Sequence, residues 1–229
     1  MLCSEFTILR QYEKSLKAEP LYCRSWSCEI CAPRRARQLR GMAMRGRPDS
    51  FLTLTVNPAW GASPQERARR LVVAWRNIRQ AWSRQHAGKK LPFLAVFEET
   101  KRGEPHLHII MRAPFISQRW LSKMMRKYMD APIVDIRRVK NQKGAAMYVS
   151  KYLSKGAKAW EGCKRYWRSK DWLLPRDDDG YKPGTFIAIL RRSYDQVMHD
   201  YRTSGITWCE VVRGNMIKIG WWSDDYVFR

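Results

Sequence analysis

The stretch PFLAVFEETKRGEPHLHIIMR, residues 92–112, decides the fold of this 229-residue chain. Two short apolar runs, 92–99 and 105–112, flank a polar loop of a length suited to a β-hairpin. Because successive side chains of a strand point to opposite faces, the second run has one apolar face and one face that carries His106 and His108. The pattern therefore predicts a sheet with one face packed against helices.

The segments around this hairpin complete a split βαβ pattern. Residues 51–56 (FLTLTV) alternate as a strand, and helical spacing of apolar residues follows from Ser63 until just before Gly88. After the hairpin the pattern predicts a helix, a strand and another helix, at about residues 117–128, 133–139 and 142–155. We expect an α+β fold, a ferredoxin-like or RRM-like split β-α-β sandwich whose antiparallel sheet has helices on one face and leaves the other free for a site.

The net charge points to a polyanionic partner. Lys and Arg number 44 against 21 Asp and Glu, which gives a formal charge of +23. A charge of this size favours nucleic acid, with a membrane lipid surface as the lesser alternative. The sequence has neither an apolar run of about 18 residues nor the layout of a signal peptide, so we expect no membrane insertion and a cytoplasmic protein.

The composition divides the chain into three segments. We expect a Cys- and Arg-rich N-terminal leader at 1–47 and the main domain at 48–157. Residues 158–229 form a basic, aromatic C-terminal extension that we expect to pack on the core. This extension ends in predicted strands near 206–212 and 216–222.

The hairpin also indicates a metal site. Pairing Glu99 with Pro105 places Glu98 opposite His106, about 4.5 to 5.5 Å apart at Cβ, on the face that also carries His108. Two imidazole nitrogens and a carboxylate then converge as ligands for a divalent metal. A slip of one residue would bring in Glu99 instead, and the histidines alone would also suit ordinary hydrogen-bonded sheet positions.

The segment MYVSKYLSK, residues 147–155, presents a tyrosine-lysine face on a helix. Tyr148 and Tyr152 lie four residues apart, beside Lys151 and Lys155. Near a bound metal, a tyrosine hydroxyl can attack a phosphodiester in line and leave a covalent phosphotyrosine. The lysines would hold DNA phosphates or lower the tyrosine pKa. Tyrosines at the amphipathic rim of a helix are the plain alternative.

Taken together and in this order, FLTLTV (51–56), GEPHLHII (103–110) and YVSKYLSK (148–155) closely resemble the three motifs of the HUH endonucleases. The resemblance is greatest to the rolling-circle replication initiators (Rep) of small single-stranded DNA phages and some plasmids, and it covers residues 51–155. It implies a Mg²⁺- or Mn²⁺-dependent, site-specific nickase that cuts single-stranded origin DNA. Such an enzyme stays on the 5′ phosphate, frees a 3′ hydroxyl for rolling-circle replication and can rejoin strands.

The resemblance also implies residue roles: His106 and His108 as metal ligands, Glu98 as the third ligand, and Tyr148 and Tyr152 as nucleophiles. Tyr148, followed three residues later by Lys151, also fits relatives that use one tyrosine, so it is the safer nucleophile. No P-loop motif occurs in the sequence. We therefore expect a host helicase and polymerase as partners, in the host cytoplasm if a phage encodes the chain.

The leader carries two further signals. Cys23, Cys28 and Cys31 form a Cys-x4-Cys-x2-Cys pattern, which would need Cys3 or a distant cysteine to complete a zinc site. Zinc and buried thiols are both open at this point. An arginine run with no acidic residue follows the cysteines, and we expect it to contact the DNA backbone through Arg34, Arg35 and Arg37.

The extension interleaves aromatic and basic residues over 158–172. This combination can stack bases and hold the phosphates of a single strand. We expect DNA contacts from Arg165 and Trp167, together with Lys155. Packing of the aromatic residues onto the core is equally open.

Two other functional classes compete with an initiator. A mobilisation relaxase or single-strand transposase would share the histidines and a tyrosine, but the paired tyrosines and the first strand motif favour an initiator. A non-enzymatic, zinc-containing nucleic-acid-binding protein would instead use the cysteine leader and the basic surface.

Overall fold

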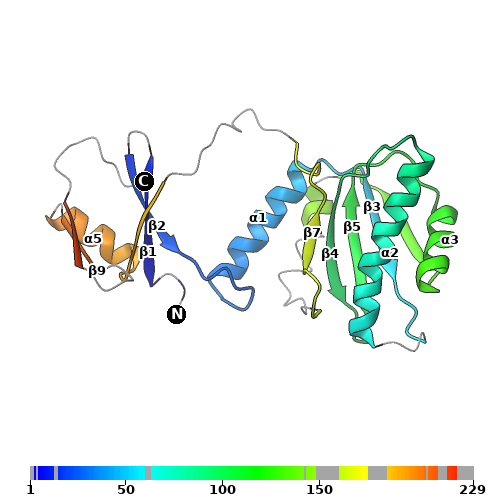
Figure 1. Ribbon diagram of the computed structural model, residues 1–229, viewed down its shortest axis with the longest axis horizontal. Coiled ribbons are helices and arrows are strands. Elements are labelled where there is room, and N and C mark those ends of the chain that lie inside the picture. The colour runs from blue at the N-terminus through cyan, green and yellow to red at the C-terminus, as the bar shows by residue number, and fades with distance from the viewer. Residues whose placement is uncertain are drawn as a thin grey trace. The chain divides into compact units, whose positions relative to one another are not determined.

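The computed structural model describes residues 3, 5–12, 15–59, 63–141, 143–147, 160–174, 185–204, 206–210 and 216–220 (Figure 1). The chain forms two compact units. The core unit comprises Pro33–Pro175, and the terminal unit combines Met1–Ala32 with Arg176–Arg229. This division differs from the three segments predicted from composition, because the leader and the extension each contribute to both units.

The core unit contains the predicted order of elements. They are β3 (Ser50–Thr55), α2 (Pro64–Gln85), β4 (Phe93–Glu99), β5 (Pro105–Met111), α3 (Gln118–Met129) and β6 (Val134–Arg138). Residues 143–147, at the start of the last predicted helix, are helical. The sequence did not predict α1 (Cys31–Arg45) or the short β7 (Tyr166–Arg168).

The strands of the core unit pair in the order β6-β3-β5-β4-β7, and every pairing is antiparallel. Without β7, this is the strand order of a split βαβ sandwich. The predicted α+β fold class is therefore confirmed. The extension adds β7 to the edge of the sheet beside β4.

Helices α2 and α3 pack on one face of this sheet (Figure 1). Alternate strand residues such as Leu54, Phe97 and Leu107 enter a common buried cluster with side chains of both helices. Helix α2 begins as the sequence predicts, with Pro64 in its first turn and the Ser63 hydroxyl accepting the backbone N–H of Glu66 at 3.2 Å. The predicted core face is confirmed.

The second face of the sheet is less open than predicted. Leu94, Val96 and Ile110 point to this face and are buried. Trp172 is also buried, and its indole N–H donates to the backbone carbonyl of Met42 near the end of α1 at 3.0 Å. The expectation of a wholly free face was wrong because apolar side chains alternate to both sides of β4. Only part of this face remains for a site.

The terminal unit contains a small sheet in the order β2-β1-β8, a helix and a hairpin. Its elements are β1 (Phe6–Tyr12), β2 (Ser15–Leu21), β8 (Thr185–Leu190), α5 (Tyr194–Ser204), β9 (Ile206–Glu210) and β10 (Met216–Gly220). The hairpin of β9 and β10 confirms the strands predicted near the end of the chain. None of the helices in the described part of the chain has the length and apolar character needed to cross a membrane.

A buried ion pair holds the start of β5 to α2. Arg67, only 5% exposed, donates from Nε and Nη2 to the two carboxylate oxygens of Glu104 at 2.8 and 2.6 Å. Such a two-pronged contact fixes direction as well as distance. Glu104 directly precedes β5, so the pair fixes where this strand begins.

We expect Arg67→Ala to lower the free energy of unfolding of the core unit by about 3 kcal/mol, because it leaves a buried carboxylate unpaired. Arg70→Ala is the matched control, since Arg70 pairs with Glu66 on the exposed side of the same helix and should cost at most about 1 kcal/mol. Guanidinium denaturation followed by tryptophan fluorescence measures both. Equal losses in the two variants would contradict this assignment.

Candidate metal centre and nucleic-acid interface

The register of the β4–β5 hairpin is the predicted one. Glu98 pairs with His106, Glu99 with Pro105, and Val96 with His108. Because side chains alternate along each strand, Glu98 shares the second face with both histidines, and Glu99 points to the opposite side. The structure thus decides between the two carboxylates in favour of Glu98.

Three potential ligand atoms converge at this end of the second face. One atom each from Glu98, His106 and His108 lies within 4.8 Å of the others. Glu98 Oε2 lies 2.6 Å from His108 Nε2, and the two imidazole rings meet edge to face with centroids 6.2 Å apart. The His108 side chain is buried, whereas the side chain of Glu98 remains 31% exposed. The cluster can therefore be reached from solvent through Glu98.

The neighbouring strand β3 supports His108 from behind. Thr53 pairs with His108 in the sheet, and its hydroxyl oxygen lies 3.1 Å from Nδ1. The ring of Phe51 stacks on the imidazole at a centroid distance of 5.7 Å. If Nε2 is the ligand atom, Nδ1 carries the proton and donates it to Thr53, which fixes the tautomer that a metal requires. This role of Thr53 was not predicted, although its place in the alternation of FLTLTV was a signal for it.

Burial keeps both imidazoles in the neutral state. Burial lowers the pKa of His106, and charge on His108 adds to this effect, while Glu98 and Glu104 act in the opposite direction. Burial likewise lowers the pKa of His108, against its hydrogen bond and the charge of Glu98. Neutral imidazole is the form that binds a metal.

This donor set fits a divalent cation. Two neutral imidazole nitrogens and a carboxylate oxygen suit a metal of intermediate hardness such as Mn²⁺, and Mg²⁺ tolerates a set with few protein ligands. Three protein ligands also leave coordination positions for oxygen atoms of a substrate. The arrangement can therefore hold a metal and a phosphate together.

The predicted nucleophile segment cannot be placed beside this cluster. Tyr148, Lys151, Tyr152 and Lys155 lie outside the described residues. The helical residues 143–147 directly precede them, and Ala146 among these is buried. The roles of the tyrosines and lysines rest on the sequence.

The predicted DNA-contacting residues divide into two kinds. Arg34 and Arg37 are exposed on α1, and Arg35 is half-buried near Arg165. Burial and the charge of Arg35 lower the pKa of Arg165, as expected where cations gather without an anion. Trp167 instead packs its ring on Phe97, at a centroid distance of 5.5 Å, against the buried cluster. For this tryptophan the packing alternative describes the structure.

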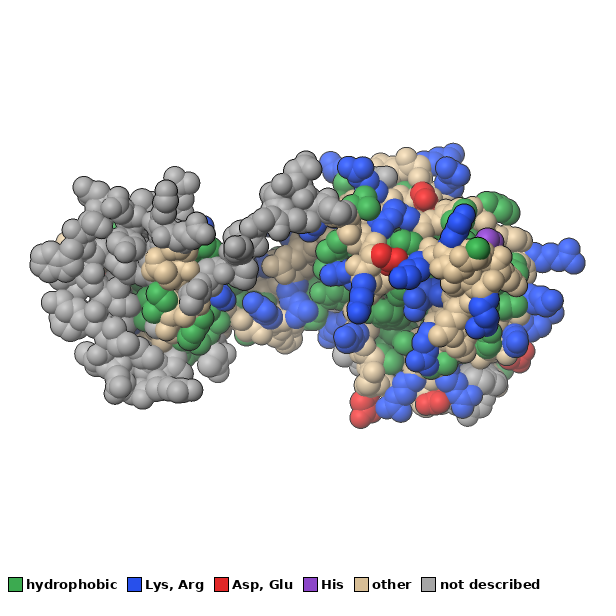
Figure 2. All heavy atoms as spheres, turned by 45° about the horizontal axis from the view of Figure 1, so that its top comes forward, with side chains coloured by type: hydrophobic (Ala, Val, Ile, Leu, Met, Phe, Trp, Pro, Cys, Tyr) green, Lys and Arg blue, Asp and Glu red, His purple; other side chains and the backbone are tan. Residues whose placement is uncertain are grey.

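Basic side chains also dominate the visible surface of the core unit. In the view of Figure 2, Lys and Arg are spread over this unit among few Asp and Glu. The distribution suits the backbone of a nucleic acid better than a single small anion.

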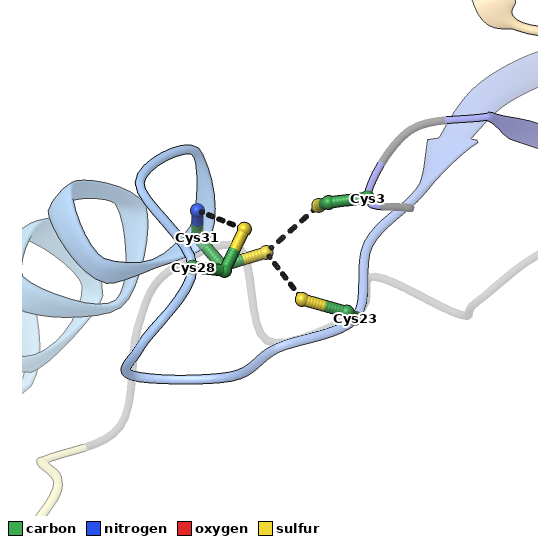
Figure 3. A group of neighbouring side chains, drawn as sticks. All are labelled: Cys3, Cys23, Cys28 and Cys31. Carbon is green, nitrogen blue, oxygen red and sulfur yellow. Dashed lines mark hydrogen bonds between the residues drawn. The ribbon is translucent and has the colours of Figure 1, made fainter. Parts of the chain in front are cut away.

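The predicted leader cysteines come together and gain a fourth partner. Cys23, Cys28 and Cys31 form a cluster with Cys3, and the four sulfur atoms lie within 4.8 Å of one another (Figure 3). The sequence left the fourth position open between Cys3 and a more distant cysteine. The fold of the terminal unit selects Cys3.

Residues 49–157, slightly less than half of the chain, match a family model of replication-associated proteins, the ORF2 type. This match confirms the resemblance to rolling-circle replication initiators over the segment that carries β3 to β6, the metal cluster and the tyrosine motif. It associates this part of the chain with DNA replication. No curated protein and no solved structure was found to match the chain.

We expect Thr53→Val to weaken Mn²⁺ binding about tenfold, because the substitution removes the acceptor that fixes the His108 tautomer. Thr55→Val, on the same face of β3 opposite His106, is the matched control and should bind almost as the wild type does. Isothermal titration calorimetry with Mn²⁺ gives both affinities. An unchanged affinity in Thr53→Val would show that the hydroxyl does not support the ligand.

The lowered histidine pKa values also predict a pH dependence. Protons displace the metal only when the pH falls through these pKa values, which lie below the ordinary histidine value of about 6.5. Mn²⁺ affinity should therefore stay nearly constant from about pH 7.5 to 6.5 and fall at lower pH. The same titration, repeated in buffers across this range, tests the sign. An affinity that already falls steeply above about pH 6.5 would contradict it.

Proposed function

We propose that the core unit is a metal-dependent endonuclease and strand transferase that nicks single-stranded DNA at a replication origin. The observation that carries the proposal is the convergence of Glu98, His106 and His108 inside a segment that matches a replication-associated family. A metal cluster of this kind has no evident purpose in a protein that only binds DNA.

The proposed reaction transfers a phosphodiester to a tyrosine. The phenol oxygen of Tyr148 attacks the phosphorus in line with the 3′ oxygen, and the bond from phosphorus to this oxygen breaks. The phenol loses its proton, the leaving 3′ oxygen gains one, and the 5′ phosphate stays on the tyrosine. A bound Mg²⁺ or Mn²⁺ supplies a Lewis acid that offsets charge on the scissile phosphate.

Each remaining residue has a proposed part in this step. Glu98, His106 and His108 hold the metal, and Lys151 lowers the pKa of the nucleophile or holds a DNA phosphate. Tyr152 provides a second nucleophile, so that strands can be exchanged at the end of a round. Because the phosphotyrosine bond retains the energy of the phosphodiester, rejoining requires no ATP.

The basic residues would hold the single strand during this reaction. Arg34 and Arg37 are exposed, and Arg35 lies near Arg165 in the same unit. Each phosphate contact of this kind contributes affinity without reading bases and weakens as salt is added. Lys155 would add a contact beside the tyrosines. A host helicase and polymerase would then open and copy the duplex.

The decisive test is a denaturing gel for covalent protein-DNA adducts. The full chain is incubated with Mn²⁺ and single-stranded fragments that tile the genetic element encoding it. We expect a shifted band that depends on metal, is lost in the Tyr148→Phe, Tyr152→Phe double variant, and falls more than about a hundredfold in His106→Ala.

Matched controls separate chemistry from folding. His86→Ala changes a histidine at the end of α2, and Tyr128→Phe changes a tyrosine of α3, and both should form the adduct as the wild type does. Absence of adduct and cleavage in a chain that still binds DNA would contradict the proposal. It would favour the non-enzymatic nucleic-acid-binding protein instead.

A further inference from the structure

The four cysteines of the terminal unit come from segments that are separate in the sequence (Figure 3). Cys3 precedes β1, Cys23 follows β2, Cys28 lies in the next loop, and Cys31 is the first residue of α1. The sulfur of the buried Cys31 lies 3.2 Å from that of Cys3 and 3.6 Å from that of Cys23. The cluster is thus centred on one sulfur that has several sulfur neighbours.

This geometry differs from that of disulfide pairs. A disulfide joins two sulfurs at about 2.05 Å and leaves no reason for a third to approach. Within the described part of the chain, no disulfide joins these cysteines. Four sulfurs around one Zn²⁺, each at about 2.3 Å from the metal, would lie about 3.8 Å from one another. The observed separations, up to 4.8 Å, are of this size.

Backbone N–H groups are already directed at two of the sulfurs. The N–H of Cys31 donates to Cys28 Sγ at 3.4 Å, and the N–H of Ser25 donates to Cys23 Sγ at the same distance. Donors of this kind offset the negative charge of metal-bound thiolates and orient them. They are independent of the sulfur contacts and point to the same kind of ligand.

The terminal unit also needs a cross-link more than the core unit does. Its described buried apolar side chains are few: Leu9, Ala18, Cys31, Leu190, Val197 and Met198. A small core of this kind is commonly stabilised by a structural metal. A metal at the cysteines would join both ends of the β1–β2 hairpin to the first turn of α1.

We propose that Cys3, Cys23, Cys28 and Cys31 bind one Zn²⁺ in a closed, structural site, separate from the metal cluster of the core unit. A soft set of four thiolates selects zinc over Mg²⁺ or Mn²⁺. Binding releases the four thiol protons and leaves a site of net charge about −2, which the basic chain tolerates. With four protein ligands no position remains for substrate, so the site stabilises the unit and takes no part in chemistry.

The metal content of the full chain tests this proposal. After expression in zinc-supplemented medium, elemental analysis should find about one Zn²⁺ per chain. Cys3→Ser and Cys28→Ser should lose most of it, whereas Cys163→Ser, which changes a half-buried cysteine of the core unit, should retain it. His106→Ala should also retain the zinc, which separates this site from the proposed catalytic one.

Replacement of zinc by Co²⁺ keeps the proposal testable if a cysteine variant does not fold. The wild-type chain should show the intense visible bands of tetrahedral cobalt and a thiolate-to-cobalt band in the near ultraviolet. In hydrogen exchange, a chelator should remove protection from peptides of residues 5–31 and leave those of β3 to β6 unchanged. A metal-free chain, bound iron, two disulfides, or full zinc in Cys3→Ser would each overturn the assignment.

Discussion

The antiparallel pairing of β4 with β5 is the constraint on which the core unit depends. With Glu98 opposite His106, one register directs Leu107, Ile109 and Met111 into the cluster beneath α2 and α3 and turns both histidines to the other face. A shift of one residue would exchange these faces, burying imidazoles in the core and exposing its apolar side chains. The stability of the fold and the assembly of the metal cluster therefore require the same hydrogen-bonding register.

The same pairing sets the electrical character of the cluster. Because Val96 and Ile110 bury the middle of the second face, His108 stands at the edge of an apolar surface. Burial there disfavours a charged imidazole, and Thr53 on β3 offers the acceptor that the neutral ring needs. Charges brought to such a place interact more strongly than in water, which suits stabilisation of a reacting phosphate. The surrounding basic surface can supply the long-range attraction that brings a polyanion to it.

The sequence predicted what depends on local pattern and close spacing. The order of strands and helices, the hairpin register and the grouping of Glu98 with His106 and His108 follow from alternation over a few residues. Thr53 and Cys3 were not assigned, because their partners lie 55 and 28 positions away and meet only through the fold. The packing of Trp167 on Phe97 and the division of leader and extension between two units are likewise tertiary facts that composition does not carry.

Anomalous diffraction from crystals soaked in Mn²⁺ tests most directly the central claim that Glu98, His106 and His108 form a divalent metal site. We expect one strong manganese peak in bonding contact with a carboxylate oxygen of Glu98 and a ring nitrogen of each histidine. His108→Gln crystals soaked in the same way should lack this peak. A wild-type crystal with manganese elsewhere and none between these three side chains would contradict the claim.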